Sequence, residues 1–100
     1  MILEIADIQI TAGKNAEFEA AIAQAAQQII SKAVGFRSYT VQHGIESPQR
    51  YVLMIQWETL ENHTVDFRQS AAFQEWRALV GPFFAAAPVV EHFTLLSQSA

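Results

Sequence analysis

The sequence contains no cysteine, which excludes disulfide bonds, thiolate metal ligands and a cysteine nucleophile. Charged residues make up only 16% of the chain, compared with about 25% in an average soluble domain. The six Lys and Arg residues are scattered and the formal net charge is −4, so nucleic acid is not an expected partner. No apolar run reaches the roughly 18–20 residues that cross a bilayer, and no basic segment precedes an apolar stretch near Met1. We therefore expect a cytoplasmic protein that does not bind membranes.

Apolar residues, in contrast, are abundant. They account for 51% of a chain of 100 residues, a length typical of one domain. We therefore predict a single domain over residues 1–100. A lone domain of this size buries only about 60–70% of the surface that its unfolded chain exposes. The excess of apolar over charged residues thus predicts a further apolar surface, either a dimer interface or a ligand cavity.

Apolar periodicity predicts the first two elements. Residues 2–10 carry apolar side chains on both sides of a two-residue alternation, which predicts a strand buried on both faces. A helix is predicted over residues 15–33, where apolar side chains recur at spacings of three and four. These side chains are Phe18, Ile22, Ala25 and Ile29. Asn15 is the predicted cap of the first turn, and Gly35 is expected to follow the helix in a left-handed conformation.

An antiparallel hairpin is predicted next. Residues 36–43 and 50–58 are rich in Phe, Tyr, Val and Thr, and turn-forming residues lie between them. Tyr39 and Tyr51 are expected to face each other across this hairpin.

The remaining sequence predicts a second helical region and a last strand. Thr59 is the predicted cap of a helical region that reaches about Phe84, and the hydroxyl of Ser70 is expected to begin a new helix within it. The predicted inner stripe of this region consists of Phe73, Trp76, Val80 and Phe83. A strand is predicted over residues 89–96.

The predicted order is strand, helix, strand, strand, helix, strand. With right-handed crossovers this order gives an α+β ferredoxin-like fold, the split βαβ arrangement of a four-stranded antiparallel sheet with both helices on one face. No helix remains to cover the other face, although the strands carry apolar side chains on both sides. We therefore predict a homodimer in which two sheets pack face to face like a barrel.

Four segments carry a resemblance to a known family. They are YVLMIQWE at residues 51–58, HTVDFRQSAAFQEWR at 63–77, GPFF at 81–84 and VVEHF at 89–93. Together with the element order, they resemble the antibiotic biosynthesis monooxygenase domains, which belong to the dimeric α/β-barrel superfamily.

The resemblance implies an activity. Members of the family include cofactor-free oxygenases that act on quinols or polyketide-derived phenols. The resemblance therefore implies a homodimeric monooxygenase that needs no cofactor and binds a small aromatic or quinol-like ligand. Haem-degrading members need an Asn on the first strand and a Trp and a His in the second helical region. The corresponding positions here resemble Ala6, Phe67 and Arg77, so haem is not expected.

Histidine suits the base that such an oxygenase needs, because its unperturbed pKa of about 6.5 lets it accept a proton near neutral pH. The predicted catalytic residues are His92 in the last strand and His63 at the start of the second helical region. Each also has a structural interpretation, His92 as a hydrogen-bonding core or interface residue and His63 as a surface or capping residue. His43 lies beside a turn and is expected to be exposed. The spacing of the histidines is not typical of a metal site, so no metal is expected.

Aromatic and basic side chains supply candidate contacts to a substrate. The predicted substrate-binding residues are Trp57, Phe67, Arg68, Phe73, Trp76, Arg77 and Phe83. The aromatic residues are expected to stack on a flat ring, and the arginines to stabilise a phenolate or carboxylate. Alternatively, the aromatic residues form the core and the arginines pair with Glu58, Glu61, Asp66 or Glu75.

Three acidic residues on the first and last predicted strands are further candidates for a functional role: Glu4, Asp7 and Glu91. If buried, each needs a partner, and an arginine of the second subunit is the simplest one.

Two further functions stay open. One is a non-oxidative isomerase or ligand-binding module of the same superfamily. The other is a structural or regulatory dimer without catalysis, which predicts an interior with no room for a ring-sized ligand.

Overall fold

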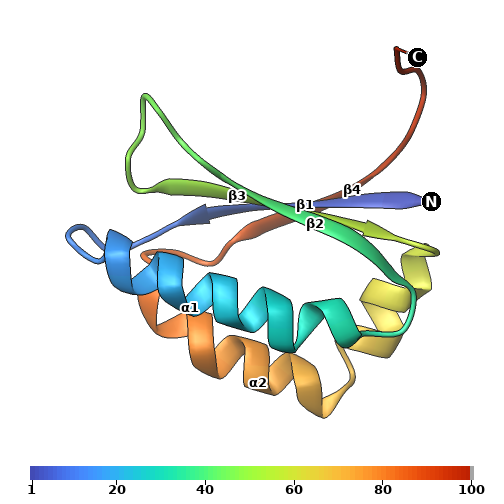
Figure 1. Cartoon of the computed structure of the whole chain (residues 1–100), viewed down its shortest axis with the longest axis horizontal. Coiled ribbons are helices and arrows are strands. Elements are labelled where there is room, and N and C mark those ends of the chain that lie inside the picture. The colour runs from blue at the N-terminus through green and yellow to red at the C-terminus, as the bar shows by residue number, and fades with distance from the viewer. Residues whose placement is uncertain (100) are drawn as a thin grey trace.

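The computed structural model describes residues 1–99, with four strands and two main helices in the predicted order (Figure 1). The strands are β1 (Ile2–Gln9), β2 (Phe36–His43), β3 (Arg50–Trp57) and β4 (Val89–Thr94). The main helices are α1 (Asn15–Gln28) and α2 (Ala71–Val80). Shorter segments are the 3₁₀ turns Ile30–Lys32 and Gly81–Phe83 and the π-helix Asn62–Phe67. Within residues 1–99, no helix has the length and apolar character needed to cross a membrane.

The strands form one antiparallel sheet in the order β2-β3-β1-β4. Both helices cover the same face of this sheet (Figure 1). This is the ferredoxin-like α+β arrangement, so the predicted fold class is confirmed. In the β1–β4 pairing Glu4 lies directly opposite His92.

The core lies between the sheet and the helices, because alternate residues of each strand point towards α1 and α2. On β1 the buried residues are even-numbered, and on β3 they are odd-numbered. The predicted stripe of α1 is buried at Phe18, Ile22 and Ala25. The helix is shorter than predicted, however, because α-helical geometry ends at Gln28 and a 3₁₀ turn follows from Ile30.

Asn15 does not cap α1, contrary to the prediction. Lys14 occupies the cap position, and no side chain bonds to the first turn there. The Asn15 side-chain amide instead donates to the Pro48 carbonyl and to the Tyr51 hydroxyl, each at 2.8 Å. An amide has two donor hydrogens, so Asn15 ties the start of α1 to the β2–β3 hairpin.

The predicted pairing of Tyr39 with Tyr51 is wrong. In the register of the β2–β3 pairing, Tyr51 lies opposite His43 and Tyr39 lies opposite Ile55. The ring of His43 is exposed and stacks on Tyr51, with 4.4 Å between ring centres.

Thr59 and Ser70 begin helical segments, as predicted. Thr59 Oγ1 accepts the backbone N–H of Asn62 at 3.2 Å, and Asn62 Oδ1 accepts the N–H of Thr59 at 2.9 Å. Ser70 Oγ accepts the backbone N–H of Phe73 at 3.2 Å and caps α2. Such caps satisfy backbone donors that a helix leaves unpaired.

Gly35 directly precedes β2 and lies close to Asn62 in the second helical region. Its φ of +82° is the left-handed conformation that the sequence predicts, and it favours glycine. A Cβ atom at this position would overlap the side chain of Asn62. Because Asn62 also caps its own segment, Gly35 is needed where β2 begins beside the π-helix.

Gly35→Ala is therefore expected to lower the free energy of unfolding by about 3 kcal/mol. About 1–2 kcal/mol comes from the left-handed backbone, and the rest comes from displacing Asn62. Gly13→Ala is the matched control, since Gly13 has the same φ of +82° with no atom within 4 Å of the added Cβ. Urea unfolding measures both losses, and equal losses would contradict the packing role of Gly35.

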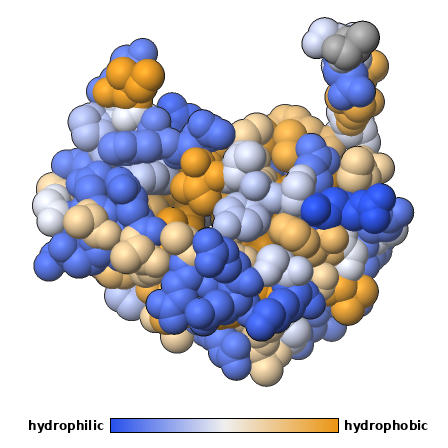
Figure 2. Space-filling view, in the orientation of Figure 1, coloured by the Kyte–Doolittle hydropathy of each residue, from blue (hydrophilic) through white to orange (hydrophobic). Residues whose placement is uncertain are grey.

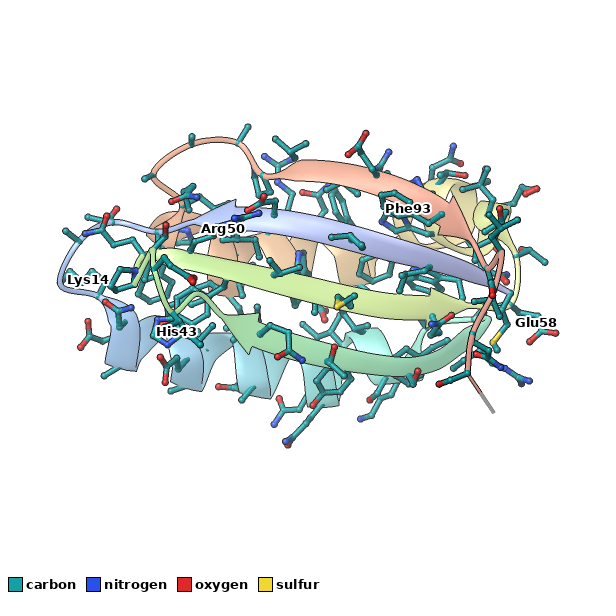
Figure 3. The ribbon with its side chains drawn as sticks, turned by 90° about the horizontal axis from the view of Figure 1, so that it is seen from above. Lys14, His43, Arg50, Glu58 and Phe93 are labelled. Atoms are coloured by element: carbon teal, nitrogen blue, oxygen red, sulfur yellow. The ribbon has the colours of Figure 1, made fainter. Side chains whose placement is uncertain are left out.

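Figure 3 looks onto the face of the sheet that no helix covers, with Phe93 labelled on β4. The strand residues that alternate with the core residues point to this face. The apolar ones are Leu3, Ile5, Val52, Met54, Val89 and Phe93. The strands thus carry apolar side chains on both faces, and Phe93 remains 44% exposed in the single chain.

Asp7 lies on the same open face and binds an arginine of its own chain. Arg50 donates to Asp7 through Nε at 3.0 Å and through Nη2 at 2.7 Å. The expectation that a second subunit supplies this arginine is therefore wrong for Asp7. The neighbouring strands β1 and β3 already bring the two residues together.

Candidate functional site

A cavity of about 720 Å³ lies between the helix-covered face of the sheet and the second helical region. Its size is in the range of pockets that bind small molecules. The residues with polar or aromatic side chains that line it are Glu4, His63, Phe67, Arg68, Phe73, Gln74, Trp76, Arg77 and Phe84. A purely structural dimer predicts a filled interior, and this cavity disagrees with that prediction.

Glu4 is the acidic residue of the cavity, and only 5% of its surface is exposed. Its Oε1 accepts the indole N–H of Trp57 at 2.9 Å. The same oxygen lies 3.4 Å from Nε2 of His63. Both partners belong to the same chain, so Glu4 is buried without an arginine from a second subunit.

The other carboxylate oxygen of Glu4, Oε2, takes no part in these contacts. Both contacts above involve Oε1. Among the described residues, no buried side-chain oxygen or nitrogen lacks a hydrogen-bond partner. Oε2 is therefore not fully buried, and Glu4 is one of the residues that line the cavity.

Burial raises the pKa of Glu4 from 4.5 to about 7. Removing a carboxylate from water disfavours its charged form. The hydrogen bond from Trp57 and the positive charge of Arg68 oppose this effect but are smaller. Glu4 is therefore close to half ionised at neutral pH, which suits a group that both accepts and returns protons.

His63 is held beside Glu4 by the π-helix. The N–H of Arg68 bonds to the carbonyl of His63, five residues earlier, at 3.1 Å. This wide turn places His63, Phe67 and Arg68 on the cavity side together, and π turns occur often at functional sites. The ring of His63 stacks on Trp57, with 5.4 Å between ring centres. Only 4% of the surface of His63 is exposed.

His92 completes a chain of three polar side chains. Its Nε2 lies 2.7 Å from Nδ1 of His63, on the side away from Glu4. Its position opposite Glu4 places it on the helix-covered face rather than on the open face. His92 does not line the cavity and is half-buried, because β4 is an edge strand.

The two histidines are neutral at physiological pH. Burial lowers the pKa of His63 from 6.5 to about 4, with smaller contributions from Arg68 and His92. Burial, followed by the charge of Arg68, also lowers the pKa of His92. The neutral form of each ring is therefore favoured over the positively charged form.

Arg68 and Arg77 both line the cavity. The guanidinium of Arg77 lies over the ring of Phe73, at 5.9 Å from its centre. Over residues 1–99, neither arginine forms an ion pair with the acidic residues that the sequence offered as partners. Glu58 instead pairs with Arg37, at 3.0 Å. Both arginines thus remain able to bind an anion in the cavity.

The structure brings together most of the residues that the sequence singled out. His63, Phe67, Arg68, Phe73, Trp76 and Arg77 line the cavity. Trp57 and Phe83 do not, since Trp57 is buried beneath His63 and Phe83 packs against Phe18. His92 reaches the cavity only through His63.

Glu4 is the residue that sequence reasoning undervalued. The sequence did contain a sign of its importance. Glu4 lies on the same side of the strand as Ala6, Ile8 and Ile10, because side chains alternate between the two faces of a strand. A charged residue in register with core positions is either paired or functional. No group of three or more His, Asp or Glu side chains in the described chain is placed to share a metal ion.

Comparison with known proteins identifies the family. The family model described as antibiotic biosynthesis monooxygenase matches residues 1–79, most of the chain. The chain belongs to the antibiotic biosynthesis monooxygenase family. This confirms the resemblance that the segments of the sequence indicate.

A bacterial relative of similar length is the "Uncharacterized protein YczJ" of Bacillus subtilis. It is 43% identical over 93 residues, which cover 93% of this chain and 97% of the relative. This antibiotic biosynthesis monooxygenase domain is therefore matched along nearly its full length.

Solved structures of the antibiotic biosynthesis monooxygenase family share the fold. A protein named "Putative antibiotic biosynthesis monooxygenase" from Bordetella bronchiseptica is 49% identical with a TM-score of 0.91, covering 96% of this chain and 97% of its own. A variant of SnoaB, a cofactor-independent oxygenase from Streptomyces nogalater, is 16% identical with a TM-score of 0.80, covering 97% and 94%. At this low identity the similarity to SnoaB shows the fold alone.

Proposed function

We propose that this protein is a homodimeric, cofactor-independent monooxygenase that oxidises a small phenol or quinol in the cavity beside Glu4. The observation that carries the proposal is a buried carboxyl group, that of Glu4, among the residues that line a cavity of about 720 Å³ with aromatic walls, and burial raises the pKa of this group to about 7. Cofactor-free oxygenation needs a base, a group that stabilises an anion and a site poor in water. Glu4 supplies the base, Arg68 supplies the group that stabilises the anion, and the aromatic walls supply the site poor in water.

Deprotonation of the substrate is the first step. The phenolic O–H bond breaks and its proton passes to the carboxylate of Glu4, leaving a phenolate. Arg68 stabilises the new negative charge from the cavity wall, because a guanidinium binds oxyanions strongly in a partly desolvated site. Phe67, Phe73 and Trp76 stack on the ring, and Arg77 binds a second anionic substituent.

Oxygen then reacts with the electron-rich ring. For a hydroquinone, one atom of O₂ enters the ring and the other leaves as water, so the products are a hydroxyquinone and H₂O. The quinol supplies all four electrons, two for the inserted oxygen and two for the oxidation to the quinone. One proton is also delivered to the oxygen atom that leaves as water, so the overall reaction releases no net proton. No external reductant is needed, which agrees with a reaction free of cofactors.

A second copy of the chain is the proposed cover of the open sheet face. The β2–β3 loop and the C-terminal segment both project from this side of the sheet (Figure 1). Figure 2 shows apolar side chains on both projections, where Ile45 is 89% exposed and Leu96 is 98% exposed. Two sheets packed face to face would bury these side chains together with the apolar face between them.

Oxygen uptake with a panel of quinols and phenols tests the proposed reaction. We expect turnover by protein dialysed against a metal chelator, and a loss of about 10²–10⁴-fold in kcat for Glu4→Gln. Glu17→Gln is the matched control, because Glu17 is exposed on α1 and does not line the cavity, and it is expected to leave kcat unchanged.

The other outcomes separate the remaining functions. Conversion of a substrate without oxygen consumption would replace the oxygenase by an isomerase, for which Glu4 would still serve as the base. Binding of ring compounds with no conversion of any of them would leave only a ligand-binding module.

A further inference from the structure

We infer that Glu4, His63 and His92 form a proton relay that connects the cavity to the outer edge of the sheet. In this relay His92 acts on the reaction through His63, without touching the substrate. It is therefore a positioning residue for proton transfer rather than a cavity residue.

The geometry is a chain of three polar side chains, in which His63 and His92 share a hydrogen bond and Glu4 lies at the longer distance of an ion pair from His63. Oε1 of Glu4 lies 3.4 Å from Nε2 of His63, and Nδ1 of the same ring lies 2.7 Å from Nε2 of His92. His63 thus uses both ring nitrogens between two partners. A neutral imidazole has one donor and one acceptor nitrogen, so each tautomer of His63 demands the complementary state of both neighbours.

Two arrangements of the chain satisfy these bonds. With Glu4 protonated, its O–H donates to Nε2 of His63, and the Nδ1–H of His63 donates to Nε2 of His92. With Glu4 ionised, the Nε2–H of His63 donates to the carboxylate, and Nδ1 accepts from the Nε2–H of His92. Both arrangements place a donor opposite an acceptor at the Glu4–His63 and His63–His92 contacts.

The change from the first arrangement to the second moves one proton outwards. The O–H bond of Glu4 breaks as a proton joins Nε2 of His63, the Nδ1–H of His63 passes to Nε2 of His92, and the Nδ1–H of His92 is released to water. Both rings stay neutral at the end, and Glu4 is left as a carboxylate. The reverse sequence returns a proton to the cavity.

His63 transmits a proton rather than storing one. Its pKa of about 4 makes a lasting imidazolium unfavourable, so a proton that enters at one nitrogen must leave from the other. The charged and titratable groups that face this chain are Glu4 from β1, His92 from β4 and Arg68 after the π-helix. The positive charge of Arg68 opposes a second positive charge on either ring.

His92 is placed to exchange protons with water. It lies on the edge strand β4 and is half-buried, whereas Glu4 and His63 are almost completely buried. It points to the helix-covered side of the sheet, because it pairs with Glu4 in register. A second subunit on the open face therefore leaves this end of the relay uncovered.

The role of the relay in turnover rests on the proposed function, in which Glu4 accepts the phenolic proton. NMR of the ligand-free protein with ¹⁵N-labelled histidine tests the relay without any turnover. We expect a coupling across the hydrogen bond between Nδ1 of His63 and Nε2 of His92. We also expect both rings to change tautomer with one shared midpoint, near the pH of about 7 at which Glu4 ionises. Fixed tautomers through this range would overturn the relay and leave the proposed oxygenase standing.

Kinetics of His92→Gln then test its consequence. The glutamine amide can still bond to His63 but cannot pass a proton on, so kcat is expected to fall about 10-fold or more with KM unchanged. His43→Gln is the matched control, because His43 lies in the same sheet but bonds to the Pro48 carbonyl outside the cavity, and it is expected to keep full kcat. Unchanged kcat in His92→Gln would overturn the relay, as would a rise in KM alone. Shared tautomer exchange without oxygen consumption on any substrate would support the relay and overturn the proposed reaction.

Discussion

The Glu4→Gln variant is expected to gain about 3 kcal/mol of stability over the wild type as the pH rises from 4 to 8. Folding raises the pKa of Glu4 from 4.5 to about 7, and each pKa unit corresponds to about 1.4 kcal/mol. Between these values the folded state binds a proton that the unfolded state has released. The wild type therefore loses stability as the pH rises through this range, whereas glutamine does not titrate.

His63 gives the opposite trend and serves as an internal check. Folding lowers its pKa from 6.5 to about 4, so its contribution is fully present above pH 6.5 and is lost as the pH falls towards 4. In the wild type the two trends oppose each other between pH 4.5 and 6.5. His63→Gln should therefore gain stability over the wild type towards low pH. Urea unfolding at several pH values measures both differences, and curves parallel to the wild type would show that neither group is perturbed by folding.

The second large effect is expected from Ile5→Lys on the open sheet face. Ile5 lies opposite Met54 on one side and Glu91 on the other, near the middle of this face. If two sheets pack together there, a lysine must be buried in an apolar interface or the interface must open. We expect the wild type to be a dimer at micromolar concentration and the variant to associate at least about 100-fold more weakly, as for a central interface residue.

Sedimentation velocity measures this association directly. Gln24→Lys is the matched control, because it adds the same charge to the exposed surface of α1, and it is expected to remain dimeric. Circular dichroism of both variants shows that the fold is kept. A wild type that sediments as a monomer at these concentrations would contradict the proposed dimer at once.

The element order and the caps at Thr59 and Ser70 were accessible from the sequence because they depend on local chemistry. Thr59, Ser70 and Gly35 act through hydrogen bonds or backbone angles within a few residues, and each does what its residue type predicts. Pairings across the hairpin were less accessible, since a change of register moves every partner. Tyr51 therefore meets His43 rather than Tyr39.

The partners of polar side chains were also poorly predicted from the sequence. Asn15 has the right type and position for a helix cap, yet it bonds to the β2–β3 hairpin. Asp7 is neutralised by Arg50, which is 43 residues away in the chain but on the neighbouring strand. Such contacts depend on which strands are adjacent, and the sequence does not list these neighbours.

The sequence by itself determined the βαββαβ order, the shortage of helices for two sheet faces and the set of histidine, arginine and aromatic residues near the site. These follow from periodicity and residue type, which act over a few residues. The tertiary structure alone decided that Glu4 lies at the centre of that set, beside the cavity, with Trp57 and His63 at one of its carboxylate oxygens. The physical reason is that burial and pKa depend on the atoms brought together from β1, β3, β4 and the π-helix, and no local pattern encodes that meeting.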